Sequence, residues 1–169
     1  MKGRNLSAAR RPGLAAAVGV LVAAAGAGIP AAAASTGGAG HRCLPQTAYV
    51  LTSNSGIVTP ISTRTNTAGP AIHVGHDPTA IAITPKGTTA YVVNNGSVTP
   101  ISTRTNTAGR AIYGGQYPEA IAITPDGKTA YVVDAVPGTV TPISTRTGTH
   151  GPAIRVGKYP SVIAITPEG

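Results

Sequence analysis

Residues 58–69 read VTPISTRTNTAG, and residues 98–109 repeat the same letters without a change. A third copy, at residues 140–151, differs at only two of its twelve positions. The flanking sequence repeats too: Ala-Tyr-Val recurs at residues 48–50, 90–92 and 130–132, and Ile-Ala-Ile-Thr-Pro recurs at residues 81–85, 121–125 and 163–167. A period near forty residues is typical of proteins whose repeated units stack on their neighbours.

Each repeated unit divides into four short strands. In the central unit we expect them at Ala80–Thr84, Thr89–Val93, Val98–Thr103 and Ala111–Tyr113. Pro-x-Gly and Asn-Gly turns separate these runs, because Pro presets φ for a turn while Gly and Asn tolerate positive φ. Beyond the N-terminal segment no apolar periodicity of 3.6 residues appears, so we expect no helices there. The sequence therefore predicts an all-β fold made of β-propeller blades, each with four antiparallel strands.

Two strands of the unit carry particular expectations. The first strand, Ala80–Thr84, is apolar on both faces and rich in alanine, which suits a crowded innermost strand between two neighbouring blades. The third strand carries Pro60, Pro100 or Pro142 near its middle. Because proline lacks an N–H donor, we expect pairing between the third and outermost strands to be short or interrupted there.

The repeats resemble a known family. Tyr91-Val92-Val93-Asn94, with the segments at residues 98–101 and 120–127, is similar to the forty-residue YVTN β-propeller repeat, and the match runs from Thr47 to Gly169. Two copies depart from the motif, because Val-Leu-Thr follows Tyr49 and Val-Val-Asp follows Tyr131. The resemblance implies an extracytoplasmic propeller, commonly of seven blades. Relatives include surface-layer-like proteins, a periplasmic DNA-binding member, and structurally similar lactonase and haem d1 propellers, whose activities do not come with the repeat itself.

The N-terminus has the order of regions that marks a secretory signal peptide. Four basic residues between Lys2 and Arg11 precede an apolar run from Leu14 to Ile29, and small residues follow at Ala32–Ala34. A membrane anchor is the alternative, but the run is shorter than the about 20 residues that a span needs and is diluted by Ala and Gly. We therefore expect a secreted protein with no stable membrane insertion after cleavage. The expected organisation is a signal peptide at 1–34, a flexible leader at 35–46, and repeats at 47–79, 80–119 and 120–161, with a further blade starting at 162–169.

Charge and cysteine content restrict the class of partner only weakly. Removal of residues 1–34 takes four of the thirteen basic residues and leaves nine against five acidic ones, a net charge of +4 instead of +8. The high isoelectric point alone does not indicate nucleic-acid binding. Cys43 is the single cysteine, so the chain cannot form an internal disulfide. We interpret it as a free thiol in the leader.

The number of expected strands raises a question about closure. The strands amount to about three blades, whereas closed propellers have about four to eight. Our leading expectation is that the sequence is a piece of a longer propeller. The alternatives are a six-bladed ring assembled from two chains, and an open fragment with exposed apolar faces.

The segments that differ between the repeats are the candidates for ligand contacts. They are the loops before each first strand and the loops between the second and third strands, which meet at one end of a propeller, around the mouth of its channel. Such mouths commonly bind ligands or proteins. The alternative is drift in unselected loops. The candidate ligand-binding residues are His76, Asp77, Tyr117, Glu119, Lys158 and Tyr159.

Arg64, Arg104 and Arg146 recur at one position per unit and predict an arc at the opposite end of the propeller. Such an arc could hold phosphates or anionic wall polymers. The alternative is a solvated strand end that keeps a secreted protein soluble. No aromatic side chain accompanies the arc as a stacking platform, so we expect nucleic acid not to be the partner.

The residues give little support to metal binding, catalysis or a cofactor. His73, His76 and Asp77 lie close in sequence, but the cluster occurs in one repeat only, so we expect no metal. We find no Gly-x-Ser-x-Gly elbow, no acid–base pair that spacing defines and no haem attachment motif, so we expect neither catalytic residues nor a cofactor. We interpret the protein as a binding or surface-interaction module whose partner is a protein, a cell-wall polymer, a small molecule or a second copy. The alternatives are a lactonase-like propeller enzyme and an extracytoplasmic nucleic-acid-binding propeller.

Overall fold

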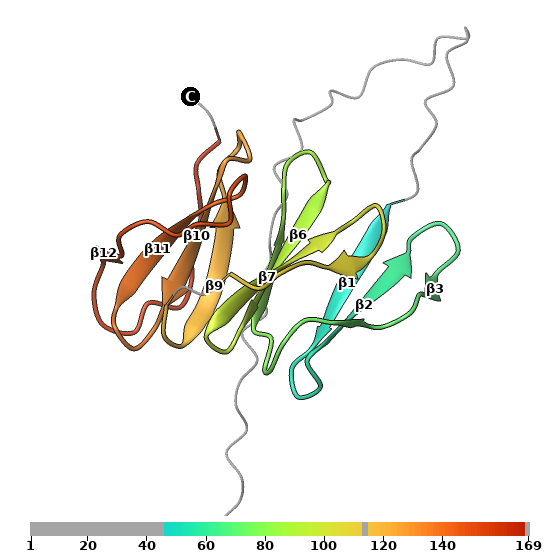
Figure 1. Cartoon of the computed structure of the whole chain (residues 1–169), viewed down its shortest axis with the longest axis horizontal. Helices are drawn as coiled ribbons and strands as arrows, with labels where there is room; N and C mark the ends of the chain where they lie inside the picture. The colour runs from blue at the N-terminus through green and yellow to red at the C-terminus, as the bar shows by residue number, and fades with distance from the viewer. Residues whose placement is uncertain (1–45, 113–114, 168–169) are drawn as a thin grey trace, which may run out of the picture.

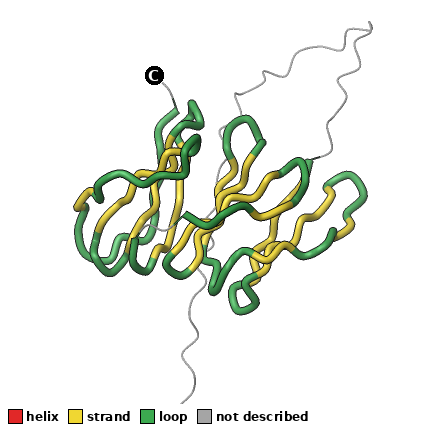
Figure 2. Tube along the Cα trace, viewed as in Figure 1, coloured by secondary structure: helices red, strands yellow, loops and turns green. Residues whose placement is uncertain are grey.

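The computed structural model describes residues 46–112 and 115–167. The expected signal peptide, nearly all of the expected leader with Cys43, and Tyr113 lie outside these residues. Within them the chain forms only strands and loops, as Figure 2 shows. No helix in the described part of the chain is long and apolar enough to cross a bilayer.

Three four-stranded antiparallel sheets make up the fold, and they stand side by side in chain order in Figure 1. The first sheet contains β1 (Thr47–Thr52), β2 (Ile57–Ser62), β3 (Thr67–Ala68) and β4 (Ile72–His73). The second contains β5 (Ala80–Ile83), β6 (Thr89–Asn94), β7 (Ser97–Ser102) and β8 (Thr107–Ala108). The third contains β9 (Pro118–Ile123), β10 (Thr129–Asp134), β11 (Thr139–Ser144) and β12 (Ile154–Arg155). The expected all-β class is confirmed.

The second and third sheets share one plan, and the first sheet lacks a part of it. β5 pairs with β6, and β9 pairs with β10, so each of these sheets has an inner strand along its Ala-Tyr-Val strand. β1 is the equivalent Ala-Tyr-Val strand of the first sheet, and within the described residues it pairs only with β2. The fourth strand of the first sheet arises because two short pieces, β3 and β4, pair with β2.

Pairing with the outermost strand is interrupted at the proline, as the sequence predicts. In the second sheet Ile101 and Ser102 of β7 pair with β8, and Val98 forms an isolated bridge to Ile112. Pro100 lies between these two contacts, where it has no N–H to donate. Its carbonyl oxygen instead accepts a hydrogen bond from the N–H of Gly109 at 2.7 Å. The same bond joins Gly69 to Pro60 and Gly151 to Pro142.

Two expectations about strands need correction. The outermost strand is not one run at Ala111–Tyr113, because the proline divides its contacts into one near Thr107 and another near Ile112. The segment Val162–Thr166 is not a strand. Its counterpart β5 pairs with β6, the strand that follows it, whereas residues 162–166 pair with no strand in the described part of the chain.

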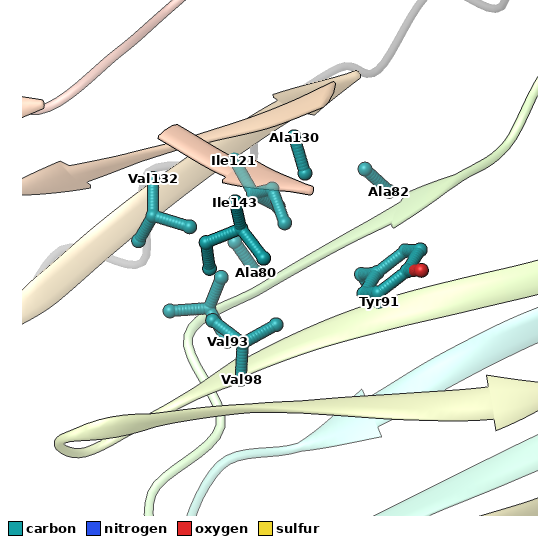
Figure 3. Packing of buried hydrophobic residues seen from close by; sticks show 9 residues of the cluster. All are labelled: Ala80, Ala82, Tyr91, Val93, Val98, Ile121, Ala130, Val132 and Ile143. Carbon is teal, nitrogen blue, oxygen red and sulfur yellow. The ribbon is translucent and has the colours of Figure 1, made fainter. Parts of the chain in front are cut away.

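The larger apolar core lies between the second and third sheets, and Figure 3 shows its side chains. From the second sheet come Ala80, Ala82, Tyr91, Val93 and Val98, and from the third come Ile121, Ala130, Val132 and Ile143. Alanines on the inner strands keep those positions small, as the sequence predicts. Every member is at most 4% exposed, so the two sheets exclude water from their contact.

A second core joins the first and second sheets. Val58, Ile72 and Val74 of the first unit meet Ala90, Val92 and Ile101 of the second. Ala90 and Val92 alternate along β6 with Tyr91 and Val93, which belong to the other core. Successive residues of a strand point to opposite faces. The second sheet is therefore buried on both faces, because it lies between the first and third sheets.

Hydrogen bonds from tyrosine hydroxyls also join neighbouring sheets. The hydroxyl of Tyr49 in β1 donates to Oδ1 of Asn106 in the second unit at 2.7 Å. The hydroxyl of Tyr91 in β6 donates to the carbonyl oxygen of Thr145 in the third unit at 3.0 Å. Burial raises the pKa of both tyrosines, so the rings remain neutral donors.

Candidate functional site

The two kinds of variable loop lie together at one end of the sheets. The N–H of Asn95, after β6, donates to the carbonyl oxygen of His76 at 3.0 Å. In the next unit the N–H of Ala135 donates to the carbonyl oxygen of Tyr117 at the same distance. The predicted neighbourhood of the first-strand loops and the second–third loops is therefore present in both units.

One position in these loops has an unusual backbone in every unit. Asp77, Tyr117 and Tyr159 have φ values of 47°, 54° and 54°. Aspartate adopts a positive φ more readily than most residues, whereas a bulky tyrosine there is an outlier. Each of the three residues also precedes a proline, which ordinarily favours an extended conformation. Such strain costs about 1–3 kcal/mol and persists only where the surroundings enforce it.

The neighbours of the strained residue explain how it is held. The proline that follows is buried at Pro78 and Pro118, so it anchors the loop against the sheets. The hydroxyl of Thr79 donates to the carbonyl oxygen of Pro118 at 3.1 Å, which links the loops of two successive units. The strained side chains themselves point outward: Tyr117 is 60% exposed and Tyr159 is 75% exposed.

The structure brings only part of the candidate set together. The loops carrying Asp77 and Tyr117 are joined through the Thr79–Pro118 contact, and Glu119 is exposed at the start of β9. Lys158 and Tyr159 lie beside the second–third loop of their own unit, where the carbonyl of Gly138 accepts the N–H of Val156 at 3.0 Å. His76 and Lys158 are exposed as well. The result is a row of exposed side chains, one group per unit.

Beneath each of two such loops lies a buried polar residue that was not among the predicted site residues. Asn94 ends β6 and Asp134 ends β10, and both are fully buried. Nδ2 of Asn94 donates to Oγ1 of Thr99 at 2.9 Å, whose hydroxyl in turn donates to the carbonyl of Val74 at 2.7 Å. The hydroxyl of Thr141 donates to Oδ2 of Asp134 at 2.7 Å.

Asp134 is the one acidic residue buried among the described residues. Burial raises the pKa of its carboxyl group, and the hydrogen bonds from Thr141 and Thr139 oppose that rise. Its Oδ1 has no hydrogen-bond partner in the described part of the chain. An open recess of about 700 Å³ reaches this side chain, lined also by Gly96, Gly115 and Pro137. A polar residue at the end of an apolar strand, repeated at Asn94, was the signal in the sequence.

The predicted arginine arc lies at the opposite end of the sheets. Arg64, Arg104 and Arg146 follow the third strand of their units, whereas the second–third loops precede it. All three are exposed, and within the described residues the ion pair found is that of Lys128 with Asp126 at 3.3 Å. Anion binding by this arc stays a prediction.

Within residues 46–112 and 115–167 no three side chains of His, Cys, Asp or Glu lie close enough to hold a metal ion. His73 and Asp77 are both exposed, in β4 and in the loop that follows it.

No protein-family model matches the chain, and no curated protein matches it either. Solved structures do match. One is hydrazine synthase of Kuenenia stuttgartiensis, with 29% identity and a TM-score of 0.64 over 67% of this chain and 33% of that chain. Another is apo AztD from Citrobacter koseri, with 14% identity and a TM-score of 0.55 over 62% of this chain and 30% of that chain. This chain spans about a third of the length of each.

Both neighbours are propeller-type structures, and the three antiparallel sheets match their architecture. The sheets are β-propeller blades. The first–second and second–third blade contacts are accordingly the two cores described above. The loops that carry Asp77, Tyr117 and Tyr159 belong to the end of the propeller at which β5 and β9 begin.

Proposed function

We propose that the protein is an exported propeller of YVTN type that binds a ligand at the end of the blades formed by its variable loops. The contacts are His76, Asp77, Tyr117, Glu119, Lys158 and Tyr159. The YVTN assignment is supported by the motif recurring in register, and export is supported by the order of regions in residues 1–34. A polymer of the cell wall suits a secreted module that presents repeated, exposed tyrosines.

One observation carries this proposal: the positive φ recurs in three units, and in two of them the residue that adopts it is tyrosine. Asp77, Tyr117 and Tyr159 all have φ near 50°. Asparagine would relieve much of this strain, and the chain does use asparagine at the equivalent φ of Asn66 and Asn106 in other turns. Keeping tyrosine at a position that favours asparagine or glycine indicates that the exposed ring is retained for contact with a partner.

The test uses purified protein and insoluble cell-wall sacculi, with binding measured by co-sedimentation. We expect the unmodified protein to pellet with sacculi and the Tyr117→Asn/Tyr159→Asn variant to lose at least about tenfold in affinity. Because asparagine fits positive φ, the melting temperature of that variant should be unchanged or higher. Loss of binding without loss of stability would place the rings in the contact surface.

The matched control is Gly148→Asn, which introduces asparagine at a φ of 68° at the other end of the blade. Its affinity for sacculi should equal that of the unmodified protein. No co-sedimentation of the unmodified protein would refute the wall-binding proposal. Equal losses in the control and the tyrosine variant would refute the assignment of the site to this end.

A further inference from the structure

The first blade has a bare face that its neighbours keep covered. Along β1 the side chains alternate between half-buried and exposed, and Val50 is 47% exposed. The equivalent residues Val92 and Val132 are 0% exposed, because each is covered by the preceding blade. The first blade thus exposes an apolar face, whereas the equivalent faces of the second and third blades pack against the preceding blade.

The third blade has a complementary face that is only partly covered. Tyr131 and Val140 of the third blade are half-buried, whereas their equivalents Tyr91 and Val98 are buried in the larger core. Val133, the equivalent of Val93, is 1% exposed. Beside them Ile154 is 50% exposed and Val156 is 53% exposed. An open groove of about 510 Å³ lies over Val133 and Val140 and is bordered by residues 160 and 162–164. The free face of the third blade thus corresponds to the face that the second blade contributes to the larger core. The free face of the first blade corresponds to the face that the third blade contributes.

Strand pairing is also incomplete at these two ends, in a complementary way. β1 has no inner partner among the described residues, although β6 and β10 have β5 and β9. Residues 162–167 read VIAITP and repeat the AIAITP of residues 80–85, yet they pair with no strand in the structure. The first blade therefore has a free inner edge at β1, and residues 162–167 have the sequence of an inner strand but no edge to pair with.

We propose that two copies of this chain close into a six-bladed ring, in which residues 162–166 of each copy pair with β1 of the other. In the register of β5 with β6, Ile81 faces Val92. The same register places Ile163 opposite Val50 of the second copy. Six blades lie within the range of about four to eight that closed propellers have. A head-to-tail contact of this kind gives a finite assembly because the ring closes.

A repeated hydrogen bond adds an independent argument for the same contact. Tyr49 and Tyr91 each donate to the turn after the third strand of the following blade. Tyr131 is their equivalent in the third blade. In the ring its hydroxyl meets the corresponding turn of the second copy, where Asn66 has the same φ of 53° as Asn106, the acceptor of Tyr49. All three tyrosines then have the same role.

The experiment combines light scattering of the purified protein with disulfide trapping. In light scattering we expect twice the chain mass measured by mass spectrometry, constant across a tenfold range of concentration. For trapping, Cys43 is replaced by Ser, and Val50→Cys is combined with Ile163→Cys. Facing Cα atoms of antiparallel strands are about 4.5–5.5 Å apart, which a disulfide can span. Mild oxidation should convert at least about half of this variant to a covalent dimer on a denaturing gel.

The matched control pairs Leu51→Cys with Ile163→Cys. Residue 51 points to the opposite face from residue 50, so this pair should give less than a tenth of the covalent dimer. A monomeric mass, or a mass that grows with concentration, would overturn the closed ring. A dimer in which both pairs or neither pair form the disulfide would overturn the exchange of residues 162–166.

Discussion

Replacing Gly56 by alanine should destabilise the protein at least about twice as much as the same change at Gly96. Both glycines lie in the loop between the second and third strands, with φ values of 62° and 79°. They differ in what a Cβ atom would meet. At Gly96 there is nothing within 4 Å, whereas at Gly56 the Cβ would overlap the carbonyl oxygen of Gly75. The pair therefore separates backbone strain from packing of the loop that leads to Asp77.

The expected magnitudes follow from these contacts. An L-residue in the left-handed region costs about 1–2 kcal/mol, partly offset by about 0.4–1 kcal/mol because alanine loses less entropy on folding. Gly96→Ala should therefore cost about 1 kcal/mol. In Gly56→Ala the chain at Gly75 must also move away, which weakens the 3.0 Å hydrogen bond from Val74 to the Gly56 carbonyl and adds about 1 kcal/mol or more.

Equilibrium unfolding in urea, followed by circular dichroism, measures both free energies. The slope of the free energy with denaturant should be the same in the two variants, since neither changes the surface exposed on unfolding. Equal destabilisation would refute the reasoning, because it would mean that the loop of Gly75 does not pack on Gly56. A larger loss at Gly96 would refute it as well.

Three further changes test the core, the contact between blades and the buried acid. Ile101→Ala removes a side chain that is 0% exposed and should cost about 2–5 kcal/mol in urea unfolding, whereas Ile83→Ala at 42% exposure should cost less than about 1 kcal/mol. Tyr91→Phe removes the hydroxyl that donates to Thr145 and should lower the free energy of unfolding by about 1 kcal/mol. The loss should be the same when Tyr91→Phe is combined with Ile101→Ala, since Ile101 belongs to the other core. The pKa of Asp134 is raised by burial, so its contribution to stability is most favourable below the unfolded pKa of about 3.9 and falls as the pH rises through the folded value. Asp134→Asn should therefore be more stable than the unmodified protein at pH 7 and about equal to it near pH 3, and a variant that is less stable at pH 7 would contradict this.

The fold could be predicted because the same apolar runs and turn residues recur in register in three units. Pro60, Pro100 and Pro142 also predicted the break in the outer ladder, since a missing donor acts locally. The fate of Val162–Thr166 could not be predicted from its own sequence, which matches that of β5. Whether such a segment forms a strand depends on a partner strand elsewhere, and the sequence of the segment itself does not indicate whether that partner is in reach.

The candidate site was predictable in position but not in conformation. Variation between repeats located His76, Tyr117 and Lys158 at one end of the blades. The positive φ of Tyr117 was not predictable, because tyrosine before proline favours an extended backbone, and tertiary contacts overrule that preference here. Asp134 was missed for a related reason: its burial depends on the close approach of Gly115, a contact between different parts of the chain.

The divided outer strand also bears on solubility. The outer edge of a sheet ordinarily offers a row of unpaired N–H and C=O groups to any other extended chain. This hazard is greatest when neighbouring repeats are nearly identical, because each copy is then a ready substitute for another during folding. In these blades the outermost contacts are two short pieces flanking Pro60, Pro100 or Pro142. A foreign strand would find no continuous ladder to extend, so the prolines protect the repeats from joining edge to edge into aggregates.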